Sequence, residues 1–347
     1  MLPSFRFASI LFLAAAGAFQ IYAGTPPRQA LWVYPDQSSS SGVVAPNTIT
    51  DAGARSLLIQ NSSASDVTDL YVSVYQSTAN SAGRQMYPDA DIADLISRAH
   101  AAKIRVWASY GNPDWPTDGC ASTGAPLKDM AQVVAYDTAN PQAQFDGVAL
   151  DIEPTDPQTT AQYQQLIAVY QCIQASLPQS AHNRLELAVA IRFSWNQEIP
   201  YPVNGPTKKV YEHIIDLDLA NVIVLGYRNT AGTDCSGSAT NGIVCLDEAM
   251  VAYAGAQNQN DLILAGVDTD NCVPGCGPSE VTFFASPNGE ADLNRQAAIA
   301  ASDFKWDAGF GGFAIYQYQN SYLNGVLQGW PAVNQEFPAM RRLSQRR

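Results

Sequence analysis

Residues 145–154, FDGVALDIEP, have the pattern of a strand that ends in two acidic side chains. Side chains alternate along a strand, so Ala149, Asp151 and Glu153 share one face. The other face carries only apolar side chains, at positions 148, 150 and 152. Pro154 ends the strand, because proline lacks an N–H donor and favours an extended backbone at the residue before it. The stretch therefore predicts a strand with one apolar face and two carboxylates at its carboxyl end.

Seven further runs of β-branched and apolar residues, bounded by turn residues, accompany this strand along the chain. The eight runs begin near Leu31, Leu70, Ile104, Phe145, Leu185, Val222, Leu262 and Gly312, at intervals of 34 to 50 residues. Helical patterns lie between them, most clearly over Asp89–Ala102 and Thr159–Ser176, where apolar residues recur at three- and four-residue spacing. Strand and helix alternating eight times predict an α/β fold, a (β/α)₈ TIM barrel.

A doubly wound open sheet would give a similar alternation of strands and helices. We find no Gly-rich phosphate loop after the first run, however, and this favours the barrel. In such barrels the catalytic groups lie at the carboxyl ends of the strands. The apolar face of the fourth strand must pack against the helices, so we expect Asp151 and Glu153 to point into the barrel mouth. The acid in the less polar surroundings should have a raised pKa.

The first residues indicate a processing signal rather than part of the fold. The apolar run Phe7–Phe19 follows Arg6, precedes small residues, and is too short to span a bilayer. We therefore expect residues 1–23 to be a cleaved secretory signal and residues 24–347 to form a single domain. The protein is expected to be secreted, or periplasmic in a bacterium, and a retained N-terminal anchor is the alternative.

The chain has six cysteines, which in an exported protein indicate three disulfides. Fifteen pairings of six cysteines exist, so the sequence leaves the connectivity open. Short spacing favours Cys235–Cys245 and Cys272–Cys276, which leaves Cys120–Cys172. A zinc site at Cys272 and Cys276 is disfavoured, because no histidine lies near them.

The charge balance excludes several classes of partner. The chain has 32 acidic and 19 basic residues and a net charge of −13, which repels nucleic acid and anionic membranes. The three histidines, His100, His182 and His213, do not lie at strand ends, so the sequence supports neither a histidine metal site nor a Ser-His triad. We expect no cofactor and no metal, no nucleic-acid or membrane partner, and a monomer.

The fourth strand resembles that of the family 18 glycoside hydrolases, the chitinase-like barrels, which reads Asp-Gly-x-Asp-x-Asp-x-Glu. The matching residues are Asp146, Gly147, Asp151 and Glu153, and Ala149 replaces one aspartate. Residues 109–112, Ser-Tyr-Gly-Asn, are similar to the Ser-x-Gly-Gly of the family's third strand. Tyr227 is similar to the tyrosine that closes the family's sixth strand.

This resemblance implies a glycoside hydrolase that cleaves a polysaccharide containing N-acetylhexosamine by a substrate-assisted retaining mechanism. Glu153 would be the general acid, and the 2-acetamido carbonyl of the substrate would attack the anomeric carbon. Asp151 would orient and stabilise the resulting oxazolinium, and Tyr227 would hydrogen-bond the acetamido group. The sequence departs from the family at Arg228, where an aspartate is usual, and at residues 316–318, where a tryptophan is usual.

Further residues at the strand ends suit a sugar ligand, because pyranose faces stack on aromatic rings and arginine binds carboxylates. We expect the guanidinium of Arg228 to reach the cleft and to bind an anionic sugar. The expected substrate-binding residues are Tyr34, Tyr75, Trp107, Ser109, Arg192, Arg228, Tyr316 and Tyr318.

Two alternatives remain open. Asp268 or Asp270, after the seventh strand, could be the nucleophile of a two-carboxylate retaining glycosidase. A non-catalytic, chitinase-like carbohydrate-binding protein is the other possibility, and the presence of Glu153 argues against it.

Overall fold

The structure is a computed structural model that describes residues 27–35, 46–76, 84–122, 124–154, 158–180, 183–200, 205–236, 242–269, 281–283, 290–318, 320–323 and 326–329. The expected signal segment, residues 1–23, lies outside the described residues, as do Asp270, Cys272 and Cys276.

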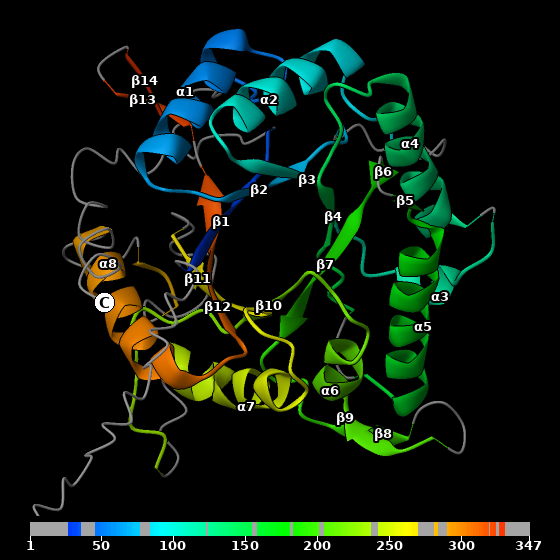
Figure 1. Ribbon diagram of the computed structural model, residues 1–347, viewed down its shortest axis with the longest axis vertical. Helices are drawn as coiled ribbons and strands as arrows, with labels where there is room; N and C mark the ends of the chain where they lie inside the picture. Colours follow the sequence, from blue (N-terminus) through cyan, green and yellow to red (C-terminus); the bar gives the residue numbers. More distant parts are fainter. Residues whose placement is uncertain are drawn as a thin grey trace, which may run out of the picture.

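Eight parallel strands form a closed barrel in the order β1-β12-β11-β10-β7-β4-β3-β2 (Figure 1). They are β1 (Arg28–Val33), β2 (Asp69–Ser73), β3 (Arg105–Tyr110), β4 (Gly147–Leu150), β7 (Glu186–Arg192), β10 (Asn221–Leu225), β11 (Ile263–Asp268) and β12 (Phe310–Tyr318). Pairing of β1 with both β2 and β12 closes the sheet and excludes the doubly wound alternative. The predicted barrel is therefore confirmed, and each of the eight predicted runs contains or adjoins one of these strands.

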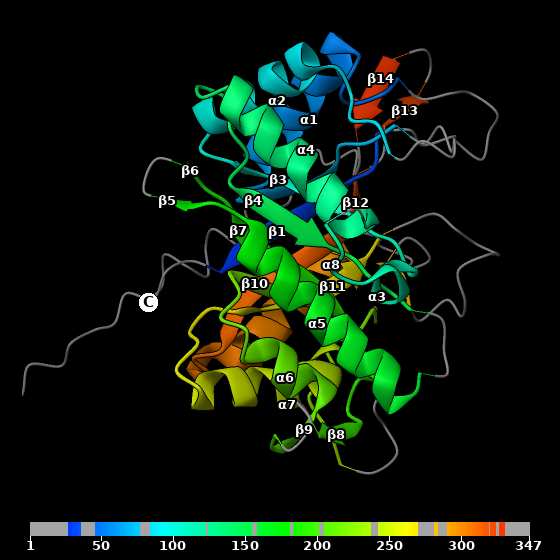
Figure 2. The same cartoon turned by 90° about the vertical axis from the view of Figure 1, so that its right-hand side faces the viewer.

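Helices surround the barrel on its outside (Figures 1 and 2). They are α1 (Ala52–Ala64), α2 (Asp89–Ala101), α3 (Trp115–Asp118), α4 (Ala125–Ala139), α5 (Thr160–Ser176), α6 (Val210–Ile215), α7 (Ile243–Ala256) and α8 (Glu290–Asp303), followed by the 3₁₀ turn η2 (Phe304–Trp306). Three antiparallel pairs stand apart from the barrel: β5 (Gln179–Ser180) with β6 (Asn183–Arg184), β8 (Glu198–Pro200) with β9 (Thr207–Lys209), and β13 (Asn320–Leu323) with β14 (Val326–Gly329). None of the described helices has the length and apolar character needed to cross a membrane.

Two predicted helices form as their sequence patterns indicate. α2 buries Ile92, Leu95, Ile96 and Ala99, the apolar set at three- and four-residue spacing. α5 begins after Thr159, whose hydroxyl accepts a hydrogen bond from the amide of Gln162 while the Gln162 side chain bonds back to the Thr159 amide. Such a capping box satisfies amide groups that lack partners within the helix, and so it fixes the start of α5.

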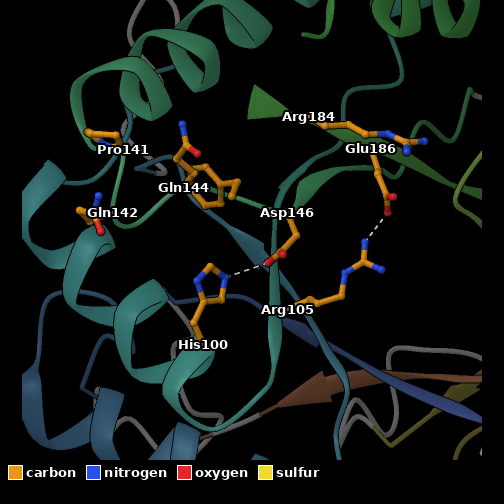
Figure 3. A pocket seen from close by; sticks show the side chains of 9 residues that line it. His100, Arg105, Pro141, Gln142, Gln144, Asp146, Arg184 and Glu186 are labelled. Atoms are coloured by element: carbon orange, nitrogen blue, oxygen red, sulfur yellow. Dashed lines mark hydrogen bonds and ion pairs between the residues drawn. The ribbon is translucent and has the colours of Figure 1, made fainter. Parts of the chain in front are cut away.

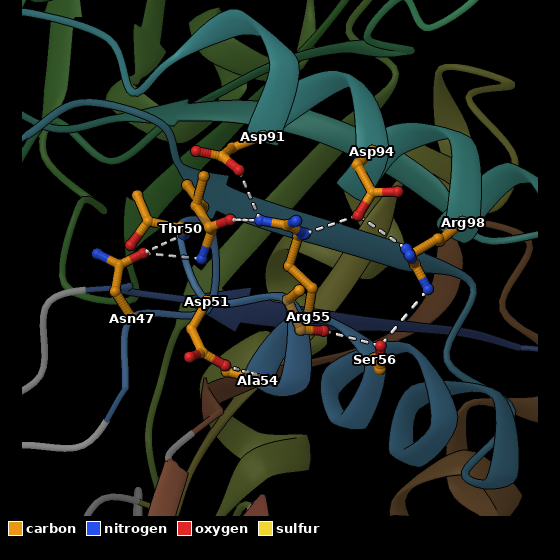
Figure 4. A network of polar contacts seen from close by, with 11 residues as sticks. Asn47, Thr50, Asp51, Ala54, Arg55, Ser56, Asp91, Asp94 and Arg98 are labelled. Atoms are coloured by element: carbon orange, nitrogen blue, oxygen red, sulfur yellow. Dashed lines mark hydrogen bonds and ion pairs between the residues drawn. The ribbon is translucent and has the colours of Figure 1, made fainter.

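A buried arginine joins the first two helices (Figure 4). Arg55 of α1 binds Asp91 at 3.0 Å and Asp94 at 2.9 Å, both on α2, and donates to the carbonyl of Ile49. Asp94 also binds Arg98 at 2.8 Å. Charge-assisted hydrogen bonds at a largely buried guanidinium are among the stronger polar contacts, so this network holds α1 and α2 together.

The apolar core has two separate parts. The larger lies between the strands and the helices and includes Val148, Leu150 and Ile152. The smaller fills the barrel interior with Trp32, Tyr71, Trp107 and several alanines, Ala149 among them. The predicted alternation along the fourth strand is therefore confirmed for its apolar residues.

Two disulfides are present in the described part of the chain. Cys120, after α3, pairs with Cys172 of α5 at a Cα–Cα distance of 6.1 Å. Cys235, after β10, pairs with Cys245 of α7 at 5.2 Å. Both expected pairings are confirmed, and they brace segments that follow the carboxyl ends of β3 and β10. Disulfides of this kind are typical of proteins exported to an oxidising compartment.

Candidate active site

The two acids of the fourth strand lie just beyond its end, in different surroundings. The amide of Asp151 donates to the carbonyl of Tyr110 at 2.8 Å, which continues the alignment of β4 with β3. Asp151 Oδ1 is buried and has no hydrogen-bond partner among the described residues. Burial, and then the charge of Glu153, raise the pKa of Asp151 to about 7, although Arg192 opposes this shift. The acid with the raised pKa is thus Asp151.

Glu153 is exposed and forms an ion pair with Arg192, at the end of the neighbouring strand β7. Its Oε2 lies 3.1 Å from Nε of Arg192, and the two side chains are 45% and 22% exposed. Arg192 ends β7 on the face that Ala188 and Ala190 turn to the barrel interior. Glu153 can therefore reach a ligand from solvent, whereas Asp151 lies beneath it in a less polar environment.

Three tyrosines from three strands gather around Asp151. Tyr34 follows β1, Tyr227 follows β10, and Tyr316 belongs to β12. The ring of Tyr316 lies 5.6 Å from that of Tyr34 and 5.9 Å from that of Tyr227. Burial raises the pKa of Tyr34 and of Tyr227, and the next largest cause in both cases is the charge of Asp151. The three rings thus form an aromatic wall with hydroxyl groups, near the partly buried Asp151.

Asp268 lies near Tyr227. It is 5% exposed and ends β11 on the same face as Leu264, whose side chain is in the barrel interior. Its charge contributes to the raised pKa of Tyr227. The structure therefore brings Asp268 to the group of tyrosines, in addition to the two acids of the fourth strand.

Arg84, which belongs to no motif in the sequence, holds the turn after β3. Its guanidinium donates to the carbonyl of Gly111 and lies over the ring of Tyr75, 4.3 Å from the centroid. Its Nε is 4.0 Å from Oδ2 of Asp129, whose pKa burial raises to about 6. No spacing pattern connects these residues, so the sequence alone gave no signal for this cluster.

Gly111 is packed directly against the backbone of Asp151. A Cβ at position 111 would lie 2.6 Å from the carbonyl oxygen of Asp151, a distance that ordinary contacts do not reach. The glycine of the third-strand motif therefore allows the close approach of two strand ends. A larger residue at position 111 would displace the backbone that carries Asp151.

We predict that Gly111→Ala destabilises the fold by about 1–3 kcal/mol, because the added methyl group is forced against backbone. Activity should fall as well, since the displaced backbone carries Asp151. Gly53→Ala is the matched control: it lies in α1, and the nearest atom to its added Cβ is a side-chain oxygen, Oδ1 of the helix-capping Asp51, at 3.2 Å rather than backbone at 2.6 Å. Denaturant unfolding and hydrolysis rates measure both effects. Loss of stability with full activity would show that the position of Asp151 does not depend on this contact.

Several of the expected binding residues lie elsewhere. Trp107 is fully buried in the barrel interior, where its Nε1 donates to Asp69 at 2.8 Å. Ser109 is 3% exposed and pairs in register with Ala149, below the level of Asp151. Tyr318 is 1% exposed and packs in the outer core, so its ring does not join that of Tyr316. The structure therefore does not bring these three side chains to the surface of the cleft.

Tyr75 and Arg228 lie at the rim. Tyr75 is half-buried and its ring stacks 5.5 Å from that of Tyr110. The guanidinium of Arg228 lies 5.7 Å from the ring centroid of Phe193, and its Nη1 donates to the carbonyl of Tyr227 at 2.7 Å. Of the two arginines expected in the cleft, only Arg192 contacts one of the paired acids.

A pocket of about 430 Å³ lies at the opposite end of the barrel (Figure 3). It is lined by residues at the amino ends of β3, β4 and β7, where His100 lies 2.9 Å from Asp146 and Arg105 pairs with Glu186. Polar groups at this end of a TIM barrel usually serve stability. The described residues contain no group of three or more His, Cys, Asp or Glu side chains that could hold a metal ion.

No protein-family model matches the chain, and no curated protein matches it in sequence. A chitinase from Chromobacterium violaceum ATCC 12472 has a similar structure, with a TM-score of 0.54 and 15% identity over 92% of this chain and 99% of that one. A chitinase from Bacteroides thetaiotaomicron has a TM-score of 0.52 and 12% identity, over 84% of this chain and 90% of that one. A chitinase from Rhizomucor miehei has a TM-score of 0.52 and 11% identity, over 92% of this chain and 100% of that one. The chain has the barrel fold of these chitinases, from which it diverges widely in sequence.

Proposed function

We propose that this protein is a secreted glycoside hydrolase that cleaves a polysaccharide containing N-acetylhexosamine. The observation that carries the proposal is the pair of acids after β4, with Glu153 open to solvent and Asp151 partly buried, its Oδ1 enclosed, near Tyr34, Tyr227 and Tyr316. Two carboxyl groups in unlike environments can take separate roles in acid–base chemistry. The chitinase fold and the two disulfides agree with this function and with export.

The proposed mechanism has two steps. In the first, Glu153 donates a proton to the glycosidic oxygen while the substrate's acetamido carbonyl oxygen bonds to the anomeric carbon, and the leaving sugar departs as an alcohol. In the second, water attacks that carbon, Glu153 takes the proton from the water, and the oxazolinium ring opens. The carboxylate form of Asp151 stabilises the positive charge of the oxazolinium, and Tyr227 hydrogen-bonds the acetamido group.

Asp268 supports a second candidate, because it is a buried carboxyl group on the interior face next to Tyr227. In a two-carboxylate retaining glycosidase it would be the nucleophile, provided that its carboxyl group lies about 5 Å from that of the acid. This mechanism needs no acetamido group on the substrate.

We expect the full chain to hydrolyse a β-1,4-linked tetrasaccharide of N-acetylglucosamine and to leave the matching tetrasaccharide of glucose intact. A thiazoline mimic of the oxazolinium should inhibit the reaction. Product analysis by mass spectrometry and inhibition curves measure both. Cleavage of both tetrasaccharides, without thiazoline inhibition and with loss of turnover in Asp268→Asn, would favour the second candidate. Binding without any cleavage would show a carbohydrate-binding protein instead.

A further inference from the structure

Two short arms of the chain after β2 pair with each other in antiparallel fashion. Tyr75 of the first arm forms a β-bridge with Met86 of the second. The amide of Gln76 donates a hydrogen bond to the carbonyl of Gln85 at 2.7 Å. Arg84 directly precedes Gln85, so this pairing fixes the point at which the Arg84 side chain leaves the backbone.

The guanidinium of Arg84 contacts two aromatic rings and a buried acid. Its central carbon lies 4.3 Å from the ring centroid of Tyr75 and 5.7 Å from that of Trp115, the first residue of α3. Its Nε lies 4.0 Å from Oδ2 of Asp129, on α4. The donors of a guanidinium form a rigid planar fork that stacks on aromatic rings. These contacts therefore fix the direction in which the remaining N–H groups of Arg84 point.

One of these N–H groups reaches the end of the third strand. Nη2 of Arg84 donates to the carbonyl of Gly111, the residue after β3. The amide of Asp151 donates to the carbonyl of Tyr110 at 2.8 Å, and a Cβ on Gly111 would lie 2.6 Å from the Asp151 carbonyl oxygen. None of the described contacts of Arg84 reaches Asp151 or Glu153 directly. Arg84 is therefore linked to Asp151 through the backbone of Gly111.

We propose that Arg84 is a positioning residue: by holding the carbonyl of Gly111, it sets where the carboxylate of Asp151 stands beside the bound sugar. This inference rests on the function proposed above, in which that carboxylate stabilises the oxazolinium. Such stabilisation requires the charge to be in place before the reaction. A displacement of about 1 Å, even when it starts far from the chemistry, can lower the rate about 10²-fold. The loss of Arg84 should therefore affect the chemical step more than substrate binding.

The first test is kinetic and uses the full chain with the tetrasaccharide of N-acetylglucosamine. Arg84→Gln should lower kcat at least about tenfold and change KM by less than about twofold, the pattern expected when only transition-state stabilisation is lost. Arg84→Lys keeps the charge and a donor but not the planar fork, so it should recover part of the loss.

The matched control is Arg55→Gln. Arg55 also donates to a backbone carbonyl, that of Ile49, and pairs with two aspartates, but none of its described contacts involves the end of β3 or β4. Its replacement should lower Tm and leave kcat unchanged. Full activity in Arg84→Gln, or an equal loss of kcat in Arg55→Gln, would refute the positioning role.

A double-mutant cycle tests whether Arg84 acts through Asp151. Arg84→Gln should lower kcat about tenfold in the unaltered chain but less than about twofold in Asp151→Asn, because the amide carries no charge to be positioned. Losses that multiply independently would show that Arg84 acts elsewhere. The inference would then be wrong, while the proposed function would stand.

A second cycle measures Tm at pH 8 and needs no substrate. Burial raises the pKa of Asp151, so its ionisation at pH 8 costs stability, and Asp151→Asn should raise Tm. If Arg84 holds the backbone of Asp151, its removal admits water to the carboxyl group, and Arg84→Gln should reduce this gain in Tm by about half. An unchanged gain would overturn the inference. A chain that cleaves no glycan but retains this coupling would remove the proposed function alone.

Discussion

Glu153→Gln is expected to lower the rate of hydrolysis about 10²–10⁴-fold, the usual effect of removing a general acid. The side chain is 45% exposed and pairs with Arg192 at the surface, so its replacement by an amide of the same size leaves the core unchanged. Binding of the oligosaccharide should therefore survive. Single-turnover rates and calorimetry on the same substrate separate the two effects.

The control for this experiment is Glu186→Gln. Glu186 is also a glutamate paired with an arginine, Arg105, but it begins β7 at the opposite end of the barrel. Its replacement should affect stability only slightly, since an ion pair that water still reaches contributes about 0–1 kcal/mol, and should leave the hydrolysis rate unchanged. Undiminished turnover by Glu153→Gln would exclude this residue as the acid, and equal losses in both variants would indicate a general effect on folding.

The strand pattern of the sequence was sufficient to predict the barrel and the orientation of its fourth strand. Alternation placed Ala149 inside and Val148 outside, and the structure agrees, because a strand with one apolar face has a single way to bury it. The same rule holds for Arg192, which follows Ala190 on the interior face. The helix α2 was equally predictable, since its buried residues recur at helical spacing.

Alternation fails in β12, and the reason is a change of register. Tyr316 and Tyr318 are two residues apart and would share a face in a regular strand. The pairing with β1 shifts by one residue, however, because Leu31 lies opposite Ile315 whereas Val33 lies opposite Tyr318. Such an irregularity turns later side chains to the other face. Tyr318 is consequently in the outer core, while Tyr316 contacts the tyrosines of the candidate site.

Contacts between distant segments were the part that the sequence could not give. Arg84 precedes β3 by many residues, yet it holds the carbonyl of Gly111 through a side chain packed on Tyr75. Trp107 lies in β3, which leads to the barrel mouth, but its large side chain is buried in the barrel interior. There its Nε1 donates a hydrogen bond to Asp69. The ion pair of Glu153 with Arg192 joins the ends of β4 and β7 and depends on the pairing of these two strands. None of these pairs has a characteristic spacing.

Asp151→Asn is expected to lower activity about 10²-fold and at the same time to stabilise the protein at neutral and alkaline pH. The rate falls because the amide cannot supply the negative charge that stabilises the oxazolinium. The pKa of Asp151 is raised to about 7 in the folded state, above its ordinary value near 4 in the unfolded chain. The folded state therefore binds more protons between these two values, and stability decreases as the pH rises from about 4 to about 7.

Asparagine removes this cost of ionising a buried acid. Three pKa units correspond to about 4 kcal/mol, and we expect about half of that, because Asp151 as a whole is only partly buried. The gain in Tm should be about 3 °C at pH 8 and should vanish near pH 4, where the aspartic acid is itself neutral.

Asp137→Asn is the matched control. Burial raises the pKa of Asp137 to about 7 as well, but this residue lies on α4, where its Oδ1 accepts a hydrogen bond from the amide of Phe145. It should change the pH dependence of Tm in the same direction and leave the rate unaltered. If Asp151→Asn instead lowered both Tm and activity at pH 8, Asp151 would be needed for the fold, and its place in the mechanism would have to be abandoned.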